Sequence, residues 1–193
     1  MVVMLLLAVL AGQPDSTIVR DPADLIARRA VGGADTAGCV IVRMLADFTG
    51  DGHTDVTVSA TCGFDDGEGW GNAGGPWEVY AYQPDNGGYR FLVELFCHPW
   101  AISLAPADSG VIITTYHRLG GGEARLVRRR LTGAVLTDRE ETPVRGTSQE
   151  LGALFDEMFP PEKRLRCQAC KLADVLSGRP EWAPGYLMPS SPD

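Results

Sequence analysis

The chain contains very little lysine, and one long stretch of it has no basic residue at all. Of its 17 basic residues only Lys163 and Lys171 are lysine, and none of the 17 lies between Met44 and Tyr89. The formal net charge is -8. A protein that holds nucleic acid or an anionic membrane does so with clustered Lys and Arg. The composition therefore argues against both kinds of partner.

Long apolar runs are also missing. A helix needs about 20 apolar residues to cross a bilayer, and no stretch of the sequence reaches that length. The first apolar run, Val2–Leu10, is followed by the small residues Ala11 and Gly12, which is typical of a cleaved signal peptide. We therefore expect residues 1–11 to be a signal peptide and the mature chain to be secreted or periplasmic. The alternative interpretation of this run is a buried first strand.

The sequence offers little for nucleophilic or redox catalysis. It has no Gly-x-Ser-x-Gly elbow that would expose a nucleophilic serine. Its single CxxC unit, Cys167-Gln-Ala-Cys170, has no second pair nearby that would complete a zinc site. A structural or packing role is the favoured interpretation of these two cysteines.

What is present is an ordinary globular composition, 45% hydrophobic and 22% charged over 193 residues. Strand-forming segments alternate with turn-forming ones through the middle of the chain, which predicts an antiparallel β-meander of about seven strands, as a sandwich, barrel or propeller-like sheet. The predicted strands are Cys39–Ala46, Val56–Cys62, Trp77–Gln83, Tyr89–Phe96, Val111–Arg118, Arg125–Leu131 and Val135–Glu140. The fold class is thus mainly β.

Helices are predicted at both ends of this meander. Asp21-Pro22 is a capping pair that begins a short N-terminal helix. Thr147-Ser-Gln-Glu150 is a capping box for a second helix, and Pro160-Pro161 separates it from a third that extends from Glu162 to Ser177. The predicted organisation is a β-domain over 17–145, a two-helix extension over 146–178 and a Pro-rich tail over 179–193.

Three carboxylates share one short loop between the first two predicted strands. In Asp47-Phe-Thr-Gly-Asp51-Gly-His-Thr-Asp55, oxygen-bearing side chains occupy positions 1, 3, 5 and 9, and glycines stand at positions 4 and 6. Ca²⁺ prefers six to eight oxygen ligands, and alternating side chains of a tightly curled loop can converge on one point. The pattern predicts a Ca²⁺ site made by Asp47, Thr49, Asp51 and Asp55, with the main-chain oxygen of His53 at position 7. An acidic turn that holds no metal is the alternative.

The loop resembles the calcium loop of FG-GAP repeats, which occur in integrin α-subunit propellers, and of the related bacterial VCBS-type repeats. The likeness continues through the apolar segment Val56–Ala60 and the Gly-Pro step before Trp77–Tyr82, and it covers about Met44–Tyr82. It implies that Asp47, Asp51 and Asp55 bind Ca²⁺ through their side chains. Thr49 stands where the family usually has Asn or Asp. Because the sequence holds a single such loop, it cannot build a propeller from repeats of it.

Two further features flank the loop. Cys39 precedes Asp47 by eight residues and Cys62 follows Asp55 by seven, so pairing of the two strands would bring these cysteines nearly opposite each other. A disulfide between them is expected in an exported protein, and two small buried side chains are the alternative. A glycine-rich segment then follows with four residues that predict a recognition loop or, equally, a solvated connection: Asp65, Asp66, Glu68 and Trp70.

These features support two functional hypotheses. The first is an exported, non-enzymatic β-domain whose calcium-ordered surface binds a protein or a glycan. The second is an envelope hydrolase in which the acidic segment forms a metal-assisted site with Asp65, Asp66 or Glu68 as base. A structural metal is enclosed by protein oxygens, whereas a catalytic metal keeps a position open for water.

Overall fold

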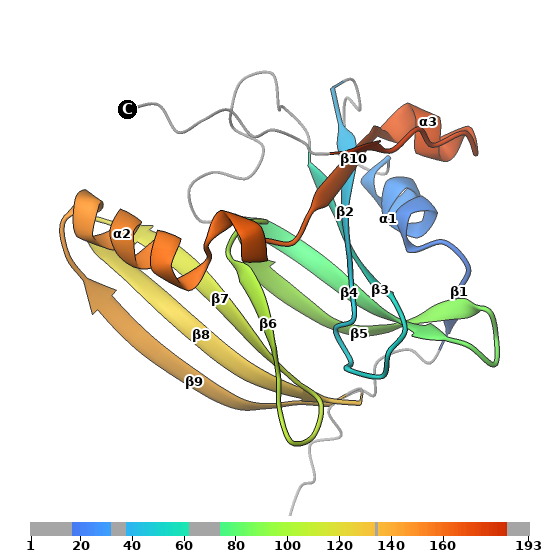
Figure 1. The fold of residues 1–193 in the computed structure, drawn as a ribbon. Helices are drawn as coiled ribbons and strands as arrows, with labels where there is room; N and C mark the ends of the chain where they lie inside the picture. The colour runs from blue at the N-terminus through green and yellow to red at the C-terminus, as the bar shows by residue number, and fades with distance from the viewer. Residues whose placement is uncertain (1–16, 32–37, 62–73, 134, 185–193) are drawn as a thin grey trace, which may run out of the picture.

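The computed structural model describes residues 17–31, 38–61, 74–133 and 135–184, which form two antiparallel sheets and three short α-helices (Figure 1). The predicted mainly β fold is therefore confirmed, and the two sheets replace the single meander. The strands are β1 (Ile18–Val19), β2 (Val40–Ala46), β3 (Asp55–Thr61), β4 (Gly75–Gln83), β5 (Gly88–Cys97), β6 (Ile102–Pro106), β7 (Val111–Gly120), β8 (Glu123–Thr132), β9 (Val135–Arg145), β10 (Cys167–Lys171) and β11 (Ala183–Pro184). The helices are α1 (Pro22–Ala30), α2 (Ser148–Met158), α3 (Leu172–Leu176) and a 3₁₀ turn over Pro161–Lys163.

The large sheet has the strand order β1-β5-β4-β3-β2-β10-β11. Its centre is the meander β2–β5, in which each strand pairs with the next along the chain, as expected for segments joined by short turns. All seven strands predicted from the sequence are present. The small sheet has the order β6-β7-β8-β9 and is also a simple meander.

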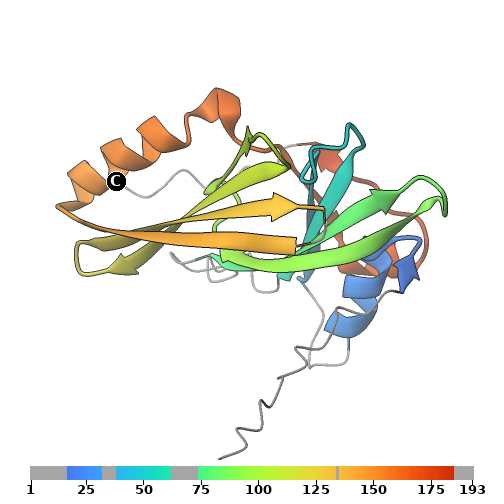
Figure 2. The same cartoon turned by 90° about the horizontal axis from the view of Figure 1, so that it is seen from below.

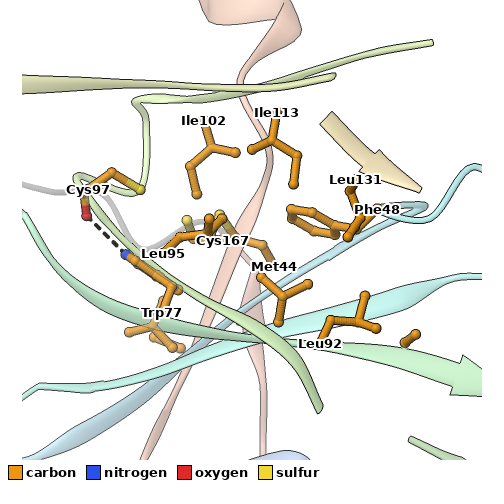
Figure 3. Packing of buried hydrophobic residues seen from close by; sticks show 14 residues of the cluster. Met44, Phe48, Trp77, Leu92, Leu95, Cys97, Ile102, Ile113, Leu131 and Cys167 are labelled. Atoms are coloured by element: carbon orange, nitrogen blue, oxygen red, sulfur yellow. Dashed lines mark hydrogen bonds between the residues drawn. The ribbon is translucent and has the colours of Figure 1, made fainter. Parts of the chain in front are cut away.

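One apolar core joins the two sheets (Figure 3). Met44, Trp77 and Leu95 come from the large sheet, and Ile113 and Leu131 come from the small one. All five side chains are at most 4% exposed. Since each sheet is apolar on the side that faces the other, neither sheet could bury its apolar side chains without its partner.

The helices cover the outer faces of the two sheets. Helices α1 and α3 pack on the outer face of the large sheet, in a second core that includes Ile26, Ile41 and Val175. Helix α2 lies on the outer face of the small sheet, where Phe155 contacts Tyr116 at 5.4 Å between ring centroids. Both views place α1 and α2 on opposite sides of the molecule (Figure 2).

Two predicted helix starts are confirmed in atomic detail. The carboxylate of Asp21 accepts hydrogen bonds from the N–H groups of Ala23 and Asp24, at 2.9 and 3.4 Å. Thr147 and Glu150 form the reciprocal capping box before α2. Both signals are local in sequence, so they act in the same way whatever the rest of the chain does.

The helix predicted over Glu162–Ser177 is wrong. Its middle, Cys167–Lys171, is strand β10, which pairs antiparallel with β2 in the large sheet, and only Leu172–Leu176 is α-helical. Cys167 and Cys170 are free thiols whose side chains belong to different cores. The free backbone edge of β2 offers this segment a ladder of hydrogen bonds, which outweighs its weak helical periodicity.

Burial keeps these thiols protonated. It raises the pKa of Cys167 to about 12 and also raises the pKa of Cys170. A thiolate is the reactive form of cysteine, so neither side chain is suited to nucleophilic or redox chemistry near neutral pH. The packing role that the sequence favoured for the CxxC unit agrees with this environment.

Several predictions lie outside the described residues: the signal peptide over 1–11, Cys62 and the candidate recognition residues Asp65, Asp66, Glu68 and Trp70. The β2–β3 register ends with Val40 opposite Thr61, one residue inside each of the two cysteines expected to pair. The Cys39–Cys62 disulfide thus stays a prediction. Within the described ranges, no helix is both long and apolar enough to span a membrane.

The turn that carries the chain from the large sheet to the small one contains a partly buried histidine. The ring of His98 lies 5.0 Å from that of Trp100, and the His98 carbonyl accepts a hydrogen bond from Ala101 N–H at 2.9 Å. Burial, together with the nearby charge of Arg164, lowers the pKa of His98 to about 4. The imidazole is therefore neutral in the folded protein at pH values where a solvated histidine already binds a proton.

We expect acid to weaken the fold through this group. Because the unfolded chain takes up the proton near pH 6.5 and the folded chain only near pH 4, stability is fully present above pH 6.5 and falls as the pH drops toward 4. At 1.36 kcal/mol per pKa unit the loss from this one group is about 3 kcal/mol. Urea unfolding between pH 7 and pH 4 measures it. The same fall with pH in His98→Gln would contradict this assignment, and His53→Gln, at an exposed site, is the control.

Candidate metal centre

The loop predicted to bind Ca²⁺ connects β2 to β3, two adjacent central strands of the large sheet. Its second residue, Phe48, is fully buried in the core between the sheets, beside Leu131 (Figure 3). Gly50 and Gly52 have φ angles of +74° and +86°, a region in which an L side chain is strained. The loop is therefore anchored by one apolar side chain and turned by two glycines.

The carboxylate of Asp47 organises the first half of the loop. Its Oδ1 atom accepts hydrogen bonds from the N–H groups of Gly50 and Asp51, at 2.6 and 3.1 Å, and its Oδ2 atom accepts one from Gly52 at 2.9 Å. These amides point toward the inside of a tight curl and have no strand partner there. A side-chain carboxylate that accepts several backbone hydrogen bonds is a local device for closing such a turn.

Asp55 is turned inward and is fully buried. Its Oδ2 atom accepts hydrogen bonds from the N–H groups of Phe48 and Thr49, at 2.8 and 2.9 Å, and from the Thr49 hydroxyl at 3.1 Å. Its Oδ1 atom accepts one from Tyr82 N–H, at 2.9 Å, on strand β4. This one side chain therefore fastens the loop to β4, two strands from β2.

The electrostatics of Asp55 are those of a buried anion. Burial raises its pKa, and the negative charge of Asp51 adds to the effect. Hydrogen bonds from Tyr82 and Thr49 act in the opposite direction because they favour the charged form.

Asp51 differs from the other two aspartates because it lies at the surface. Its side chain is 45% exposed, and its Oδ1 atom accepts a hydrogen bond from His53 N–H at 2.8 Å. The His53 ring nitrogen Nδ1 lies 3.4 Å from the same oxygen. Within the part of the chain that the structure describes, the Oδ2 atom of Asp51 accepts no hydrogen bond.

The donor types of the loop fit a hard cation, since carboxylate, hydroxyl and carbonyl oxygens are the ligands Ca²⁺ prefers. The arrangement of the side chains fits a cation less well than their donor types do. Across the described ranges, no group of three or more His, Cys, Asp or Glu side chains is placed to hold a metal ion. The carboxylates of Asp47 and Asp55 accept hydrogen bonds from N–H groups of the loop, and Asp55 also accepts one from Tyr82. The Ca²⁺ site stays a prediction.

Sequence reasoning missed a second polar cluster on the inner face of the small sheet. In the run Arg128-Arg129-Arg130 on β8, strand alternation sends Arg129 to the opposite side from its two neighbours. There it lines a pocket together with His117 and Arg139. The signal available in the sequence was the arginine triplet within a predicted strand. The triplet alone does not indicate which residues of other strands face each arginine.

Comparison with known proteins gives no match: no family model, no curated protein and no solved structure is similar to the chain. The likeness of the Asp47–Asp55 loop to FG-GAP loops therefore stands on the residues of this sequence alone.

Proposed function

We propose that the chain is an exported, non-enzymatic β-domain that binds a protein or a glycan, with Ca²⁺ ordering the Asp47–Asp55 loop. What supports this is the position of an oxygen-rich loop between two central strands, with one carboxylate still free to accept a ligand. A bound ion would supply a positive charge beside three carboxylates that repel one another. The ion would have a structural role only and would take no part in a reaction.

The hydrogen bonds within the loop leave limited room for a cation. A carboxylate has about four lone-pair directions, and Asp47 uses three of them on amides at 2.6 to 3.1 Å. The Thr49 hydroxyl makes a fourth, longer contact with Asp47 at 3.4 Å. Asp51 uses one lone-pair direction, to accept a hydrogen bond from His53 N–H. The exposed Asp51 and the half-buried Asp47 would therefore hold the ion at the loop surface, with Thr49 and the His53 carbonyl beside them. Asp55 would contribute chiefly through its charge. Surface sites of this kind bind Ca²⁺ weakly, as extracellular modules do.

The ordering of the loop matters for binding because of what adjoins it. The ring of His53 lies 5.9 Å from that of Tyr82, which in turn lies 5.4 Å from Tyr89. All three side chains are at least partly exposed. Aromatic rings with polar tips at a partly exposed site are the side chains that binding surfaces use most. Fixing the loop would fix one side of this aromatic group.

The test is thermal unfolding in Ca²⁺ and in chelator. Calcium at a hundred times its dissociation constant should stabilise the wild type by about 2.7 kcal/mol, because the ion binds the ordered loop and not the unfolded chain. Asp51→Ala should remove this increment and change the stability in chelator very little, since its side chain accepts only one exposed backbone bond. Asp85→Ala, at an exposed acid in the β4–β5 turn, is the matched control and should keep the full increment. Equal melting temperatures of the wild type in Ca²⁺ and in chelator would refute the site.

A further inference from the structure

A pocket of about 250 Å³ lies between the end of β5 and the inner face of the small sheet. That face packs against the large sheet at Ile113 and Leu131, and the pocket is formed farther along the same face. Its walls come from four strands, β5, β7, β8 and β9, so the pocket exists only because the two sheets meet. Its volume suits a small molecule rather than a macromolecular segment.

The polar wall of the pocket carries more positive charge than its neighbours neutralise. It contains Arg125, Arg129 and Arg139, and the adjacent carboxylate is Glu141. Glu141 contacts both Arg125, at 3.0 Å, and Arg139. Among the described residues, no carboxylate lies within 4.0 Å of Arg129. Three guanidinium groups share one carboxylate, which leaves about two positive charges unneutralised at a partly buried site.

The two sequence neighbours of Arg129 show that the lack of an acidic partner is a property of the pocket and not of strand β8. Arg128 lies 3.9 Å from Glu140, and Arg130 lies 3.3 Å from Asp138. Both neighbours point to the other face of the strand, and each has its own acidic partner on β9. Burial, and the charge of Arg139 after it, lower the pKa of Arg129, and the charge of Glu141 acts in the opposite direction. The net lowering is the expected effect on a cation whose surroundings supply too little negative charge.

The remaining walls are apolar and partly exposed. Phe96 and Leu119 are 50% and 53% exposed, although both are large hydrophobic residues, and Leu95 and Val127 lie deeper. Large apolar side chains left open to water beside an unpartnered cation are suited to a ligand that has both an apolar part and a negative charge.

One neutral polar pair completes the pocket. The Oγ1 atom of Thr115 lies 2.9 Å from His117 Nε2. Burial lowers the pKa of His117, and the charges of Arg125, Arg129 and Arg139 lower it further, while Glu141 acts in the opposite sense. The lining residues of β5 carry no titratable group, so these are the charges that face His117. A bound anion would oppose the arginines and raise the pKa of His117.

From this geometry we propose that the pocket binds a small organic anion, with a carboxylate on Arg129 and an apolar chain against Phe96 and Leu119. An anion here would give Arg129 the partner that its neighbours already have. It would also cover two exposed apolar side chains in one step. The proposal does not depend on the calcium loop, which belongs to a different part of the fold.

Titration of the full chain with octanoate, followed by calorimetry and by the ring resonances of His117, tests the proposal. Octanoate should bind saturably at one site and move the His117 titration to higher pH. Acetate supplies the charge without the chain, 1-octanol supplies the chain without the charge, and inorganic phosphate supplies charge alone as a multiply charged anion. Each of these three should bind at least tenfold more weakly than octanoate.

The decisive variants are two neighbouring arginines on opposite faces of one strand. Arg129→Met keeps the length and the apolar stem of the side chain and should weaken octanoate binding at least tenfold. Arg128→Met, the matched control, should change it less than twofold, and Arg129→Lys should retain part of the affinity. Circular dichroism and the melting temperature establish that each variant is folded. The proposal is overturned if the wild type shows no saturable octanoate binding, if 1-octanol binds as well as octanoate, or if the two methionine variants lose affinity equally.

Discussion

Replacement of Asp55 by alanine should lower the free energy of unfolding by about 3 to 5 kcal/mol, with or without Ca²⁺. Three backbone N–H groups, those of Phe48, Thr49 and Tyr82, would lose their acceptor at a site that water does not reach freely. Each unsatisfied buried group costs about 1 to 3 kcal/mol. Removal of a buried charge recovers part of that cost, which is why we expect less than the full sum.

Two comparisons make this prediction specific. Asp55→Asn keeps one acceptor oxygen but turns an NH₂ group toward N–H donors, so it should be destabilised to an intermediate degree. Asp47→Ala removes as many backbone contacts at the surface, where water replaces them, and should cost only about 1 kcal/mol. Urea unfolding of all three variants in chelator measures the series. If Asp55→Ala unfolds within 1 kcal/mol of the wild type, the hydrogen bonds of Asp55 do not hold the loop in place.

The second large effect is expected at Trp77, the largest fully buried side chain of the core. Trp77→Ala should cost about 3 to 5 kcal/mol, because it leaves a cavity where the two sheets meet. The indole N–H donates to the Cys97 carbonyl at 3.1 Å, at the point where β5 leaves the large sheet (Figure 3). The ring therefore fills the core and also fixes the start of the crossing between the sheets.

Trp77→Phe separates these two roles, since it keeps most of the ring volume and removes the donor. It should cost about 1 to 3 kcal/mol through the unsatisfied carbonyl and the smaller volume. Phe96→Ala, at a half-exposed aromatic of the adjacent strand, is the control and should cost less than about 1 kcal/mol. Chemical denaturation monitored by far-UV circular dichroism gives the free energies. A loss at Trp77→Ala no larger than that at Phe96→Ala would contradict the assignment of Trp77 to the core.

Local signals in the sequence were sufficient for much of the fold. The seven predicted strands, the Asp21 cap and the Thr147–Glu150 capping box are all present, because alternation, turn residues and caps act over a few residues. The nine-residue acidic loop was also located correctly between β2 and β3. Its aspartates could be found from the sequence because the tight curl requires glycine and acceptor side chains at fixed spacing.

Only the tertiary structure decided where those side chains point and what the weaker segments become. Cys167–Lys171 is a strand because the edge of β2 is free to pair with it. The residues of Cys167–Lys171 themselves do not indicate that such an edge exists. Asp55 faces inward because Tyr82, 27 residues away, presents an N–H group to it. Arg129 lines a pocket because a second sheet approaches that face of β8. In each case the partner is distant along the chain, and the free energy gained on contact is larger than any local preference of the segment.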